Sequence, residues 1–372
     1  MYLLTEYRTA DLTLPNRIVL APMTRLRSHP DGSPTADVAD FYAQRAAAGL
    51  IVTEGIWPHS TGQSEAWVPG LQTAAHIEAW RVVTAAVHAR GGRIVAQLMH
   101  GGRKNHPRGR IDGSHPAGPS AVVDPEPVHL IAGGKAAPIV PAALTRDEIR
   151  ALPGQFAAAA RNAVAAGFDA VELHGANSYL LHQFLADNTN LRTDEYGGSI
   201  ANRLRAPLAV VDAVAAAIGA RRTAIRLSPG NPQFHMAEAD PAPLYRALVA
   251  ELDRRGLAYL HLTDNDRYRA LADLRPRWHG TLIGNIGENR APTDAASAEA
   301  ALRAGHADLI SFGRAWIANP DLVHRIAHGL PLAAIRAERL YGRDARGYTD
   351  YPAHAGTETR TAIGAPLRAN GR

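Results

Sequence analysis

The sequence predicts an α/β fold in which eight parallel strands close into a (β/α)8 barrel, built as one domain over residues 1–372. Eight short apolar runs of strand length recur along the chain, and Ala-rich stretches with helical periodicity lie between them. The doubly wound alternative is disfavoured, because the turn after the first run, Ala21-Pro22-Met23-Thr24, lacks the Gly-x-Gly-x-x-Gly pattern that such a sheet requires.

The eight predicted strands are apolar almost throughout, as expected for strands that are buried on both faces. They cover residues 18–22, 50–55, 93–99, 170–174, 223–228, 259–263, 281–285 and 308–313. The helical patterns run over Ile77 to Ala89, Thr145 to Ala166, Arg203 to Ile218, Pro243 to Arg255 and Thr293 to Ala304. Several end at a glycine typical of helix C-termini, namely Gly91, Gly167, Gly256 and Gly305.

Two irregular segments interrupt this alternation. Residues 101–143 follow the third strand and are too long for a plain connection, so we expect a capping segment over the barrel mouth. The other is the tail over about 341–372. The densest basic stretch, Arg103 to Arg110, lies in the cap and has no interleaved aromatic residues. It therefore does not predict nucleic-acid binding, but a solvated loop or one that meets an anionic ligand.

The composition excludes several classes of function. The chain is 46% hydrophobic and 20% charged, with a net charge of +5, which is typical of a globular protein. The absence of cysteine excludes disulfides, thiolate metal sites and a catalytic thiol, and fits a reducing compartment. No signal peptide and no apolar run of membrane-spanning length is visible. We therefore expect a cytoplasmic protein, monomeric or homo-oligomeric, without a metal and without nucleic-acid or membrane partners.

Polar residues near the carboxyl ends of the strands indicate the active site, since (β/α)8 barrels place their chemistry there. Gln97 and Arg226 lie inside apolar strands, where an amide and a guanidinium need acceptors. Arg226 could pair with the buried Glu172, and Gln97 could satisfy backbone groups. Together at one barrel mouth, Gln97 and Arg226 suit a ligand with carbonyl and ring-nitrogen acceptors.

The ends of the last two strands predict a phosphate site. Gly287 and Gly313 would let backbone N–H groups approach oxygens closely, and Arg314 adds positive charge beside a helix start. Glycines at both of these strands favour a phosphorylated cofactor.

The stretch from His174 to Tyr179 joins a strand to a helix. At about 100° per residue, a helix would place His174 and Asn177 side by side and Tyr179 on the opposite face. A strand end that turns into a helix could aim all three at one point, with Gly175 loosening the turn. The spacing does not fit a metal site, because no carboxylate stands at ligand spacing from His174. The trio suits two donors for one oxygen and a phenol acid nearby.

These residues resemble the Old Yellow Enzyme family of FMN-dependent ene-reductases, over nearly the whole chain from Leu14 to Pro352. The most specific match is His174-Gly-Ala-Asn177-Ser-Tyr179-Leu-Leu-His-Gln-Phe-Leu, followed by the run from Asn190 to Arg203. Supporting matches are the run from Ala21 to Arg25, the strand that holds Gln97, and the run from Phe312 to Leu322.

The resemblance implies a reaction and a role for each residue. NAD(P)H would reduce a non-covalent FMN, whose N5 passes hydride to the β-carbon of an activated alkene. His174 and Asn177 would bind the substrate's carbonyl or nitro oxygen, and Tyr179 would protonate the α-carbon. Met99 and Tyr348 would line the substrate pocket. The implied flavin contacts are Pro22, Met23, Thr24, Gly55, Gln97, Arg226, Asn285, Gly287, Gly313 and Arg314.

Three departures from the family pattern affect these assignments. Met99 stands where many relatives carry Trp, which predicts a more open or differently shaped pocket. The run over 284–289 differs from the usual one, so the phosphate contacts there can shift by one or two positions. The cap also diverges, so substrate preference does not transfer. The same site could serve a pathway-specific dehydrogenase or a reductase of nitro groups or nitrate esters, whereas a flavin carrier would not need Tyr179.

Overall fold

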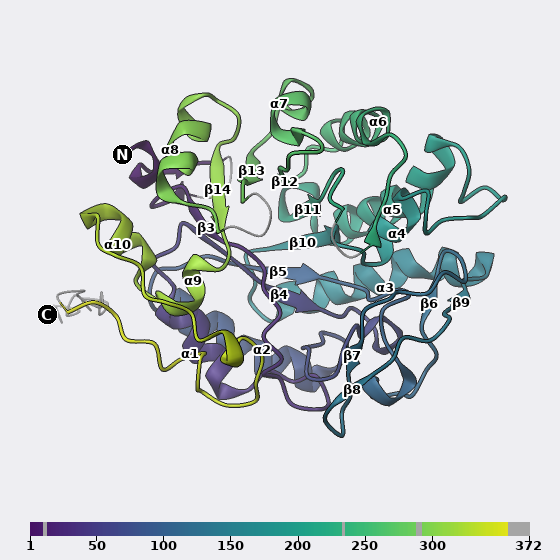
Figure 1. The fold of residues 1–372 in the computed structure, drawn as a ribbon, viewed down its shortest axis with the longest axis horizontal. Coiled ribbons are helices and arrows are strands. Elements are labelled where there is room, and N and C mark those ends of the chain that lie inside the picture. The colour runs from purple at the N-terminus through teal and green to yellow at the C-terminus, as the bar shows by residue number, and fades with distance from the viewer. Residues whose placement is uncertain (10–12, 233–234, 288–291, 356–372) are drawn as a thin grey trace, which may run out of the picture.

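The computed structural model describes residues 1–9, 13–232, 235–287 and 292–355, and in it eight parallel strands form a closed barrel (Figure 1). The order around the barrel is β10-β11-β12-β13-β14-β3-β4-β5, so each strand neighbours the next one along the chain. The predicted fold class and all eight predicted strands are confirmed. The strands are β3 (Ile18–Leu20), β4 (Leu50–Ile56), β5 (Ile94–Leu98), β10 (Ala170–Gly175), β11 (Thr223–Leu227), β12 (Leu260–Thr263), β13 (Leu282–Asn285) and β14 (Leu309–Phe312).

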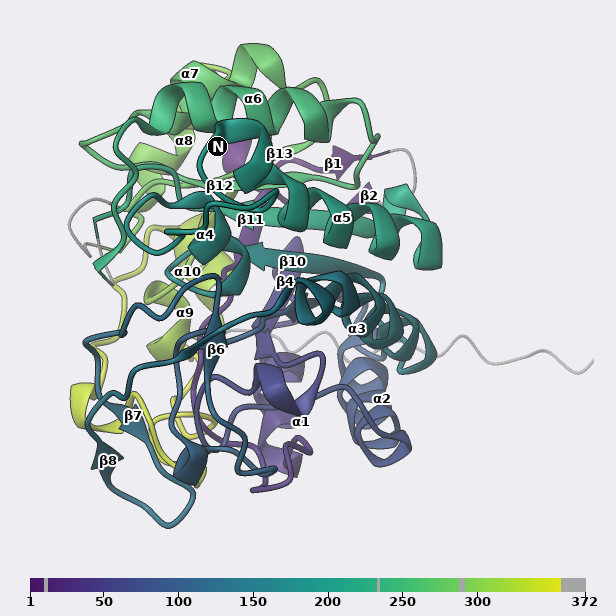
Figure 2. The same ribbon diagram turned by 90° about the vertical axis from the view of Figure 1, so that its right-hand side faces the viewer.

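Helices surround the barrel and connect its strands (Figures 1 and 2). They are α1 (Ala36–Gln44), α2 (Ala74–His88), α3 (Arg146–Ala165), α4 (Leu180–Leu185), α5 (Ile200–Ile218), α6 (Pro241–Asp253), α7 (Ala270–Leu274), α8 (Ala295–Arg303), α9 (Ala315–Ala318) and α10 (Leu322–His328). The five predicted helices correspond to α2, α3, α5, α6 and α8. The four predicted helix-ending glycines all have positive φ, as that role requires.

Successive side chains on each strand point alternately to two apolar cores. Outward side chains such as Ile51 and Leu173 pack against the helices. Inward side chains near the amino ends, such as Val52, Val95 and Leu309, form a separate apolar floor inside the barrel. This period of two is the ordinary alternation of a strand. The same alternation points the polar residues near the carboxyl ends of these strands into the barrel, above the apolar floor.

The hairpin of β1 (Tyr7–Arg8) and β2 (Thr13–Leu14) packs against the amino end of the barrel. Leu14 is 1% exposed and belongs to the inner floor. The amino end is thereby closed in part by apolar side chains, and the carboxyl end carries the polar ones.

Segment 101–143, which the sequence predicts to cap the barrel mouth, follows β5 in the chain. It contains two short strand pairs: β6 (Ala117–Gly118) runs parallel to β9 (Ala142–Ala143), and β7 (Val128–His129) pairs antiparallel with β8 (Lys135–Ala136). These strand pairs lie outside the barrel, at the periphery of the molecule (Figures 1 and 2).

The prediction of a solvated basic loop in the cap is wrong. Arg103, Lys104 and Arg110 are buried, although they belong to the densest basic stretch of the sequence. Arg103 and Lys104 lie 3.6 and 4.0 Å from the carboxylate of Asp124. Arg110 donates to the carbonyl oxygen of Gln63. A buried guanidinium needs such acceptors, so these charges serve the internal structure of the cap.

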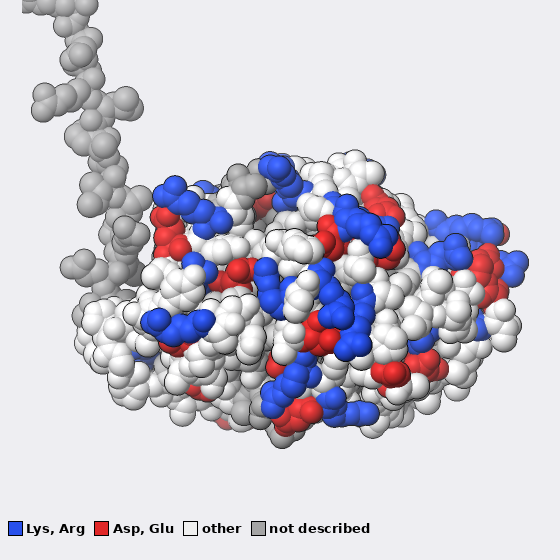
Figure 3. Space-filling model, turned by 90° about the horizontal axis from the view of Figure 1, so that it is seen from above, with Lys and Arg blue, Asp and Glu red and all other residues white. Residues whose placement is uncertain are grey.

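The surface mixes both signs of charge. On the face in Figure 3, Lys and Arg side chains alternate with Asp and Glu and form no field of one sign. Among the helices of the described residues, none is both long and apolar enough to cross a membrane.

Candidate active site

A cavity of about 390 Å³ opens at the carboxyl ends of the barrel strands. It collects most of the flavin-contact residues that the sequence predicts, from segments far apart in the chain. The lining includes Pro22, Met23, Asn177, Arg226, Asn285, Gly287, Gly313 and Arg314. The cavity is therefore the candidate active site.

The turn from β10 into α4 positions Asn177 and Tyr179. Asn177 and Ser178 both have positive φ, at 53° and 68°, which is rare for residues other than glycine. The Asn177 N–H donates to Ser228 Oγ at 2.9 Å, and the Ser178 N–H donates to His182 Nδ1 at 3.2 Å. These two bonds hold the left-handed turn, so that Asn177 reaches the cavity and Tyr179 begins α4 at its N-cap.

The role predicted for Gly175 is wrong. Gly175 is the last residue of β10, and its φ is not positive. A Cβ at this position would lie 3.0 Å from Leu227 Cδ2 and 3.2 Å from the carbonyl oxygen of Arg226. Gly175 thus permits close approach of β11, and the turn itself comes from Asn177 and Ser178.

His174 and Tyr179 lie beside each other, with ring centroids 5.1 Å apart. Burial lowers the pKa of His174 well below its ordinary value, and the nearby charge of Arg226 lowers it further. Burial likewise raises the pKa of the Tyr179 phenol, with Glu65 adding to the effect. At neutral pH the imidazole is therefore neutral and the phenol protonated. His174 Nδ1 is buried and has no hydrogen-bond partner within the described chain.

Gln97 and Arg226 belong to one buried network inside the barrel. Gln97 Nε2 donates to Glu172 Oε1 at 2.7 Å, so its partner is a side chain rather than backbone. Arg226 makes no direct ion pair with Glu172; its Nη1 lies 3.3 Å from His261 Nε2 and its Nη2 3.3 Å from Asn285 Oδ1. His261 Nδ1 in turn lies 2.9 Å from Glu172 Oε2.

The predicted phosphate contacts lie together at one side of the cavity. Gly287, Gly313 and Arg314 all line it. A Cβ on Gly313 would have no atom closer than Met23 Sδ at 3.7 Å, so the space above this glycine is open to a ligand. Of the run over 284–289, positions 288 and 289 lie outside the described residues, as does the tail after residue 355.

Seven predicted site residues do not line this cavity: His174, Tyr179, Gln97, Thr24, Gly55, Met99 and Tyr348. Thr24 is half-buried beside Met23. Gly55 and Met99 are buried against each other, because a Cβ on Gly55 would overlap the Met99 thioether. Tyr348 is fully buried, with its ring stacked on Phe41 at 4.2 Å. The contact of Tyr348 with a substrate therefore stays a prediction.

Sequence reasoning missed the end of the sixth barrel strand. Thr263, the last residue of β12, and Asp264 to Arg267 after it all line the cavity. The signal was present, because a polar run follows an apolar strand directly there. It also missed His261 as an interior residue, for which strand alternation with Tyr259 and Thr263 would have been the clue.

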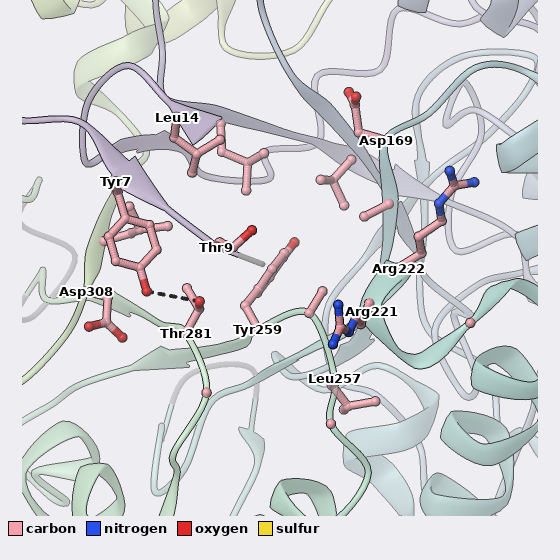
Figure 4. Close-up of a pocket in the computed structure, with 18 of the residues that line it drawn as sticks. Tyr7, Thr9, Leu14, Asp169, Arg221, Arg222, Leu257, Tyr259, Thr281 and Asp308 are labelled. Carbon is pink, nitrogen blue, oxygen red and sulfur yellow. Dashed lines mark hydrogen bonds between the residues drawn. The ribbon is translucent and has the colours of Figure 1, made fainter. Parts of the chain in front are cut away.

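A larger cavity, of about 930 Å³, lies at the amino end of the barrel (Figure 4). Two pairs of its polar groups are engaged with each other. Tyr7 Oη lies 3.1 Å from Thr281 Oγ1, and Arg275 pairs with Asp308 at 2.8 Å. Tyr259 and Leu14 also line this cavity and belong to the apolar floor of the barrel. Active sites of (β/α)8 barrels occupy the other end, so we assign the chemistry to the smaller cavity.

The residues at the carboxyl end fit a flavin phosphate as cofactor. Arg226 Nε is buried and unpartnered in the part of the chain that the structure describes, so it can donate to a ring acceptor. Asn285 and Thr263 offer further polar groups, and Gly313 with Arg314 suits an anion. Fold and site together define a flavin-binding (β/α)8 barrel oxidoreductase.

Comparison with known proteins gives the family. The profile of the NADH:flavin oxidoreductase / NADH oxidase family matches residues 8–333. The chain belongs to the Old Yellow Enzyme family within it, and is an FMN-dependent oxidoreductase. Among solved structures, the Old Yellow Enzyme homologue from Zymomonas mobilis superposes with a TM-score of 0.90 at 38% identity, covering 95% of this chain and 99% of that one.

Two further relatives extend the comparison. Morphinone reductase superposes with a TM-score of 0.89 at 42% identity, over 94% of this chain and 96% of its own. A probable flavin mononucleotide-dependent alkene reductase from Leishmania infantum is 40% identical, over 91% of this chain and 94% of its own length.

Proposed function

We propose that this protein reduces the C=C bond of α,β-unsaturated carbonyl compounds or nitroalkenes, using NAD(P)H. The observation that carries the proposal is the juxtaposition of His174 and Tyr179, with ring centroids 5.1 Å apart, next to Asn177 at the cavity. FMN would supply the hydride chemistry when bound, taking hydride from the nicotinamide and giving it to the alkene.

His174 and Asn177 would hold the substrate oxygen. Hydride addition places negative charge on this oxygen, and two fixed donors stabilise that charge as it forms. A neutral imidazole can donate one N–H, and the lowered pKa of His174 keeps it neutral at physiological pH. The hydrogen bond from the Asn177 N–H to Ser228 fixes the backbone that carries the second donor.

Tyr179 would deliver the proton to the α-carbon. Tyr179 is the N-cap of α4 and has an extended backbone, so its side chain leaves the chain in a different direction from that of a residue within the helix. Burial raises its pKa, so the phenol carries its proton throughout the neutral range. A weak acid of this kind suffices for a carbanion-like carbon, which is a strong base.

FMN would be held from the opposite side of the cavity. Arg226 and Gln97 would face the pyrimidine part of the flavin, and Pro22, Met23 and Thr24 would flank it. The phosphate would bind at Gly287, Gly313 and Arg314, with Asn285 nearby. The co-location of these residues supports this arrangement, because most of them line one cavity.

The names of relatives support the substrate class. Besides the alkene reductase above, 12-oxophytodienoate reductase 1 from Oryza sativa subsp. japonica is 37% identical over 94% of this chain. A structure of morphinone reductase in complex with tetrahydroNAD is 43% identical, which fits a nicotinamide reductant here.

The function is tested with purified protein under anaerobic conditions. We expect a yellow preparation that NAD(P)H bleaches and that 2-cyclohexenone returns to yellow, with one saturated ketone formed per flavin. A flavin that NAD(P)H reduces but that enones, maleimides and nitroalkenes all fail to reoxidise would contradict the proposal. A panel of nitrate esters run in parallel would show whether the site prefers that alternative.

A further inference from the structure

Glu172 and His261 form a buried pair that the proposed mechanism does not use. Both side chains are 0% exposed, and they come from β10 and β12, which lie on either side of β11 in the barrel. They lie inside the barrel above the apolar floor and below the cavity, which neither residue lines. Burying a carboxylate there is costly unless its charge and lone pairs are satisfied.

The hydrogen bonds of this pair have one consistent direction. Glu172 Oε1 accepts from Gln97 Nε2 at 2.7 Å, and Oε2 lies 2.9 Å from His261 Nδ1. Because an ionised carboxylate can only accept, His261 Nδ1 carries the proton. His261 Nε2 is then an acceptor, for Arg226 Nη1 at 3.3 Å and for Ser311 Oγ at 2.9 Å. Burial lowers the pKa of His261 to about 4, in agreement with a neutral ring.

This chain of bonds fixes the Arg226 guanidinium from below. Nη1 is engaged by His261 and Nη2 by Asn285 Oδ1, while the buried Nε has no partner among the residues described. The planar guanidinium is thus held through Nη1 and Nη2, and its Nε–H group is available to a ligand. Gln97 is anchored to the same carboxylate. One acidic group therefore orients both of the residues assigned to the flavin pyrimidine.

The pair also controls the net charge beneath the cofactor. Glu172 carries −1, Arg226 carries +1 and His261 is neutral, so the buried group has no net charge. In an interior of low dielectric constant, such charges act over several ångström. The charge of Glu172 acts on Arg226 and offsets the loss of solvation by its guanidinium. A flavin bound above Arg226 would therefore experience a weaker positive charge, because the Glu172 carboxylate partly cancels the charge of Arg226.

We propose that Glu172, through His261, tunes the reduction potential of the bound FMN: it positions Arg226 and lowers the potential by partly cancelling its charge. This inference rests on the proposed function, in which Arg226 faces the flavin pyrimidine, where negative charge gathers on reduction. Glu172 and His261 are positioning residues.

The decisive measurement is the reduction potential of FMN in Glu172→Gln, by anaerobic titration against reference redox dyes. This change removes the charge and preserves the shape. Gln97 can turn its amide over to accept from the new side-chain amide, so the hydrogen bond between the two side chains is kept. We expect a shift to a more positive potential. Glu172→Asp, whose carboxylate is withdrawn by one methylene, should shift the potential in the same direction but less, and it serves alone if Glu172→Gln does not fold.

The protein contains a matched control. Glu238 and His182 form a second buried pair, 2.8 Å apart, with Tyr245 as a further donor at 2.7 Å. This pair lies between α4 and α6, and it contacts none of Gln97, Arg226 or Asn285 through a hydrogen bond in the described structure. Glu238→Gln should leave the potential unchanged. An unshifted potential in the Glu172 variants, or an equal shift in Glu238→Gln, would overturn the inference.

A third variant separates this inference from the function on which it rests. Arg226→Met should shift the potential to more negative values, because it removes the cation. If Arg226→Met shifts the potential and Glu172→Gln does not, only the role of Glu172 is wrong. If Arg226→Met binds FMN with the wild-type potential, Arg226 does not face the flavin, and the cofactor placement in the proposed function fails with it.

Discussion

At the scale of single residues, burial shifts the pKa values of His174 and Tyr179 in opposite directions. Burial disfavours the charged form of both groups, so the imidazole loses its proton and the phenol keeps its own. The two groups are thereby prepared for different roles, the first as a neutral donor and the second as an acid.

The first prediction concerns Tyr179→Phe. We expect FMN binding and flavin reduction by NAD(P)H to stay within about twofold of wild type, because the phenol does not take part in them. Reduction of enones that need protonation should fall by roughly 10²-fold or more, the usual contribution of a general acid. Anaerobic stopped-flow kinetics of the two half-reactions separates these steps. Wild-type alkene reduction by the variant would show that another group supplies the proton.

The second prediction concerns the buried carboxyl of Glu54, which accepts a bond from the Arg25 N–H at 3.2 Å. Burial raises the pKa of Glu54 from 4.5 to about 7, against the opposing effect of Arg25 and Arg27. The folded state therefore binds this proton more tightly than the unfolded state does. The stabilisation is complete below about pH 4.5 and is lost as the pH rises through about 7.

Glu54→Gln should remove this dependence. The free energy of unfolding of wild type should fall relative to the variant between about pH 5 and 7, by up to about 3 kcal/mol. Urea denaturation at a series of pH values measures the difference. Glu78→Gln, which changes an exposed carboxylate, is the control and should follow wild type. Parallel curves for Glu54→Gln and wild type would show that Glu54 ionises normally.

At the scale of elements, the turn from β10 to α4 combines two constraints. Asn177 and Ser178 occupy a region of φ that costs an ordinary residue about 1–2 kcal/mol. Hydrogen bonds from Asn177 to Ser228 and from Ser178 to His182 hold the turn in spite of that cost. Strain of this kind persists where surrounding contacts over-determine the backbone, as is common at active sites.

The third prediction follows from the strain at Ser178. Its hydroxyl oxygen is buried and has no partner in the described region, so only the backbone of this residue contributes. Ser178→Gly should raise the free energy of unfolding by about 0.5–1 kcal/mol, since glycine adopts positive φ freely but is more flexible when unfolded. Urea denaturation measures this change.

The reverse control is Gly91→Ala. Gly91 has φ of 76° and open space around its Cβ position, so the substitution tests φ alone. It should lower stability by about 1 kcal/mol. If Ser178→Gly destabilises the protein instead, the turn does not carry the strain that its dihedral angles indicate.

At the scale of the whole molecule, a ligand that binds only the folded barrel couples the site to global stability. The cavity is lined by residues from the ends of β3, β10, β11, β12, β13 and β14, so it exists only when the barrel is closed. A ligand bound there stabilises the fold by mass action.

The fourth prediction compares FMN with riboflavin, which lacks the phosphate. FMN at about 100 times its Kd should raise the free energy of unfolding of the apoprotein by about 2.7 kcal/mol. Riboflavin at the same concentration should stabilise much less, because it cannot use Gly313 and Arg314. Thermal and urea denaturation of the apoprotein measure both. Equal stabilisation by the two flavins would place the phosphate outside this cavity.

The sequence by itself determined the barrel and the seam at His174, Asn177 and Tyr179. Both depend on residues that are close in the sequence. The strands are apolar runs and several helices end at glycines, and the three residues of the seam lie within six positions of each other. The sequence also predicts that Pro22, Arg226, Gly287 and Arg314 lie close together, as they do in the cavity, because strand ends in a barrel meet at one mouth.

Only the tertiary structure decided which buried groups pair. Glu172 and His261 are 89 residues apart and meet because of the barrel register, which no local pattern encodes. For the same reason the sequence misplaced Arg103, which Asp124 holds inside the cap. Strand and helix formation depends on neighbours in the chain, whereas burial, pairing and hence pKa depend on neighbours in space.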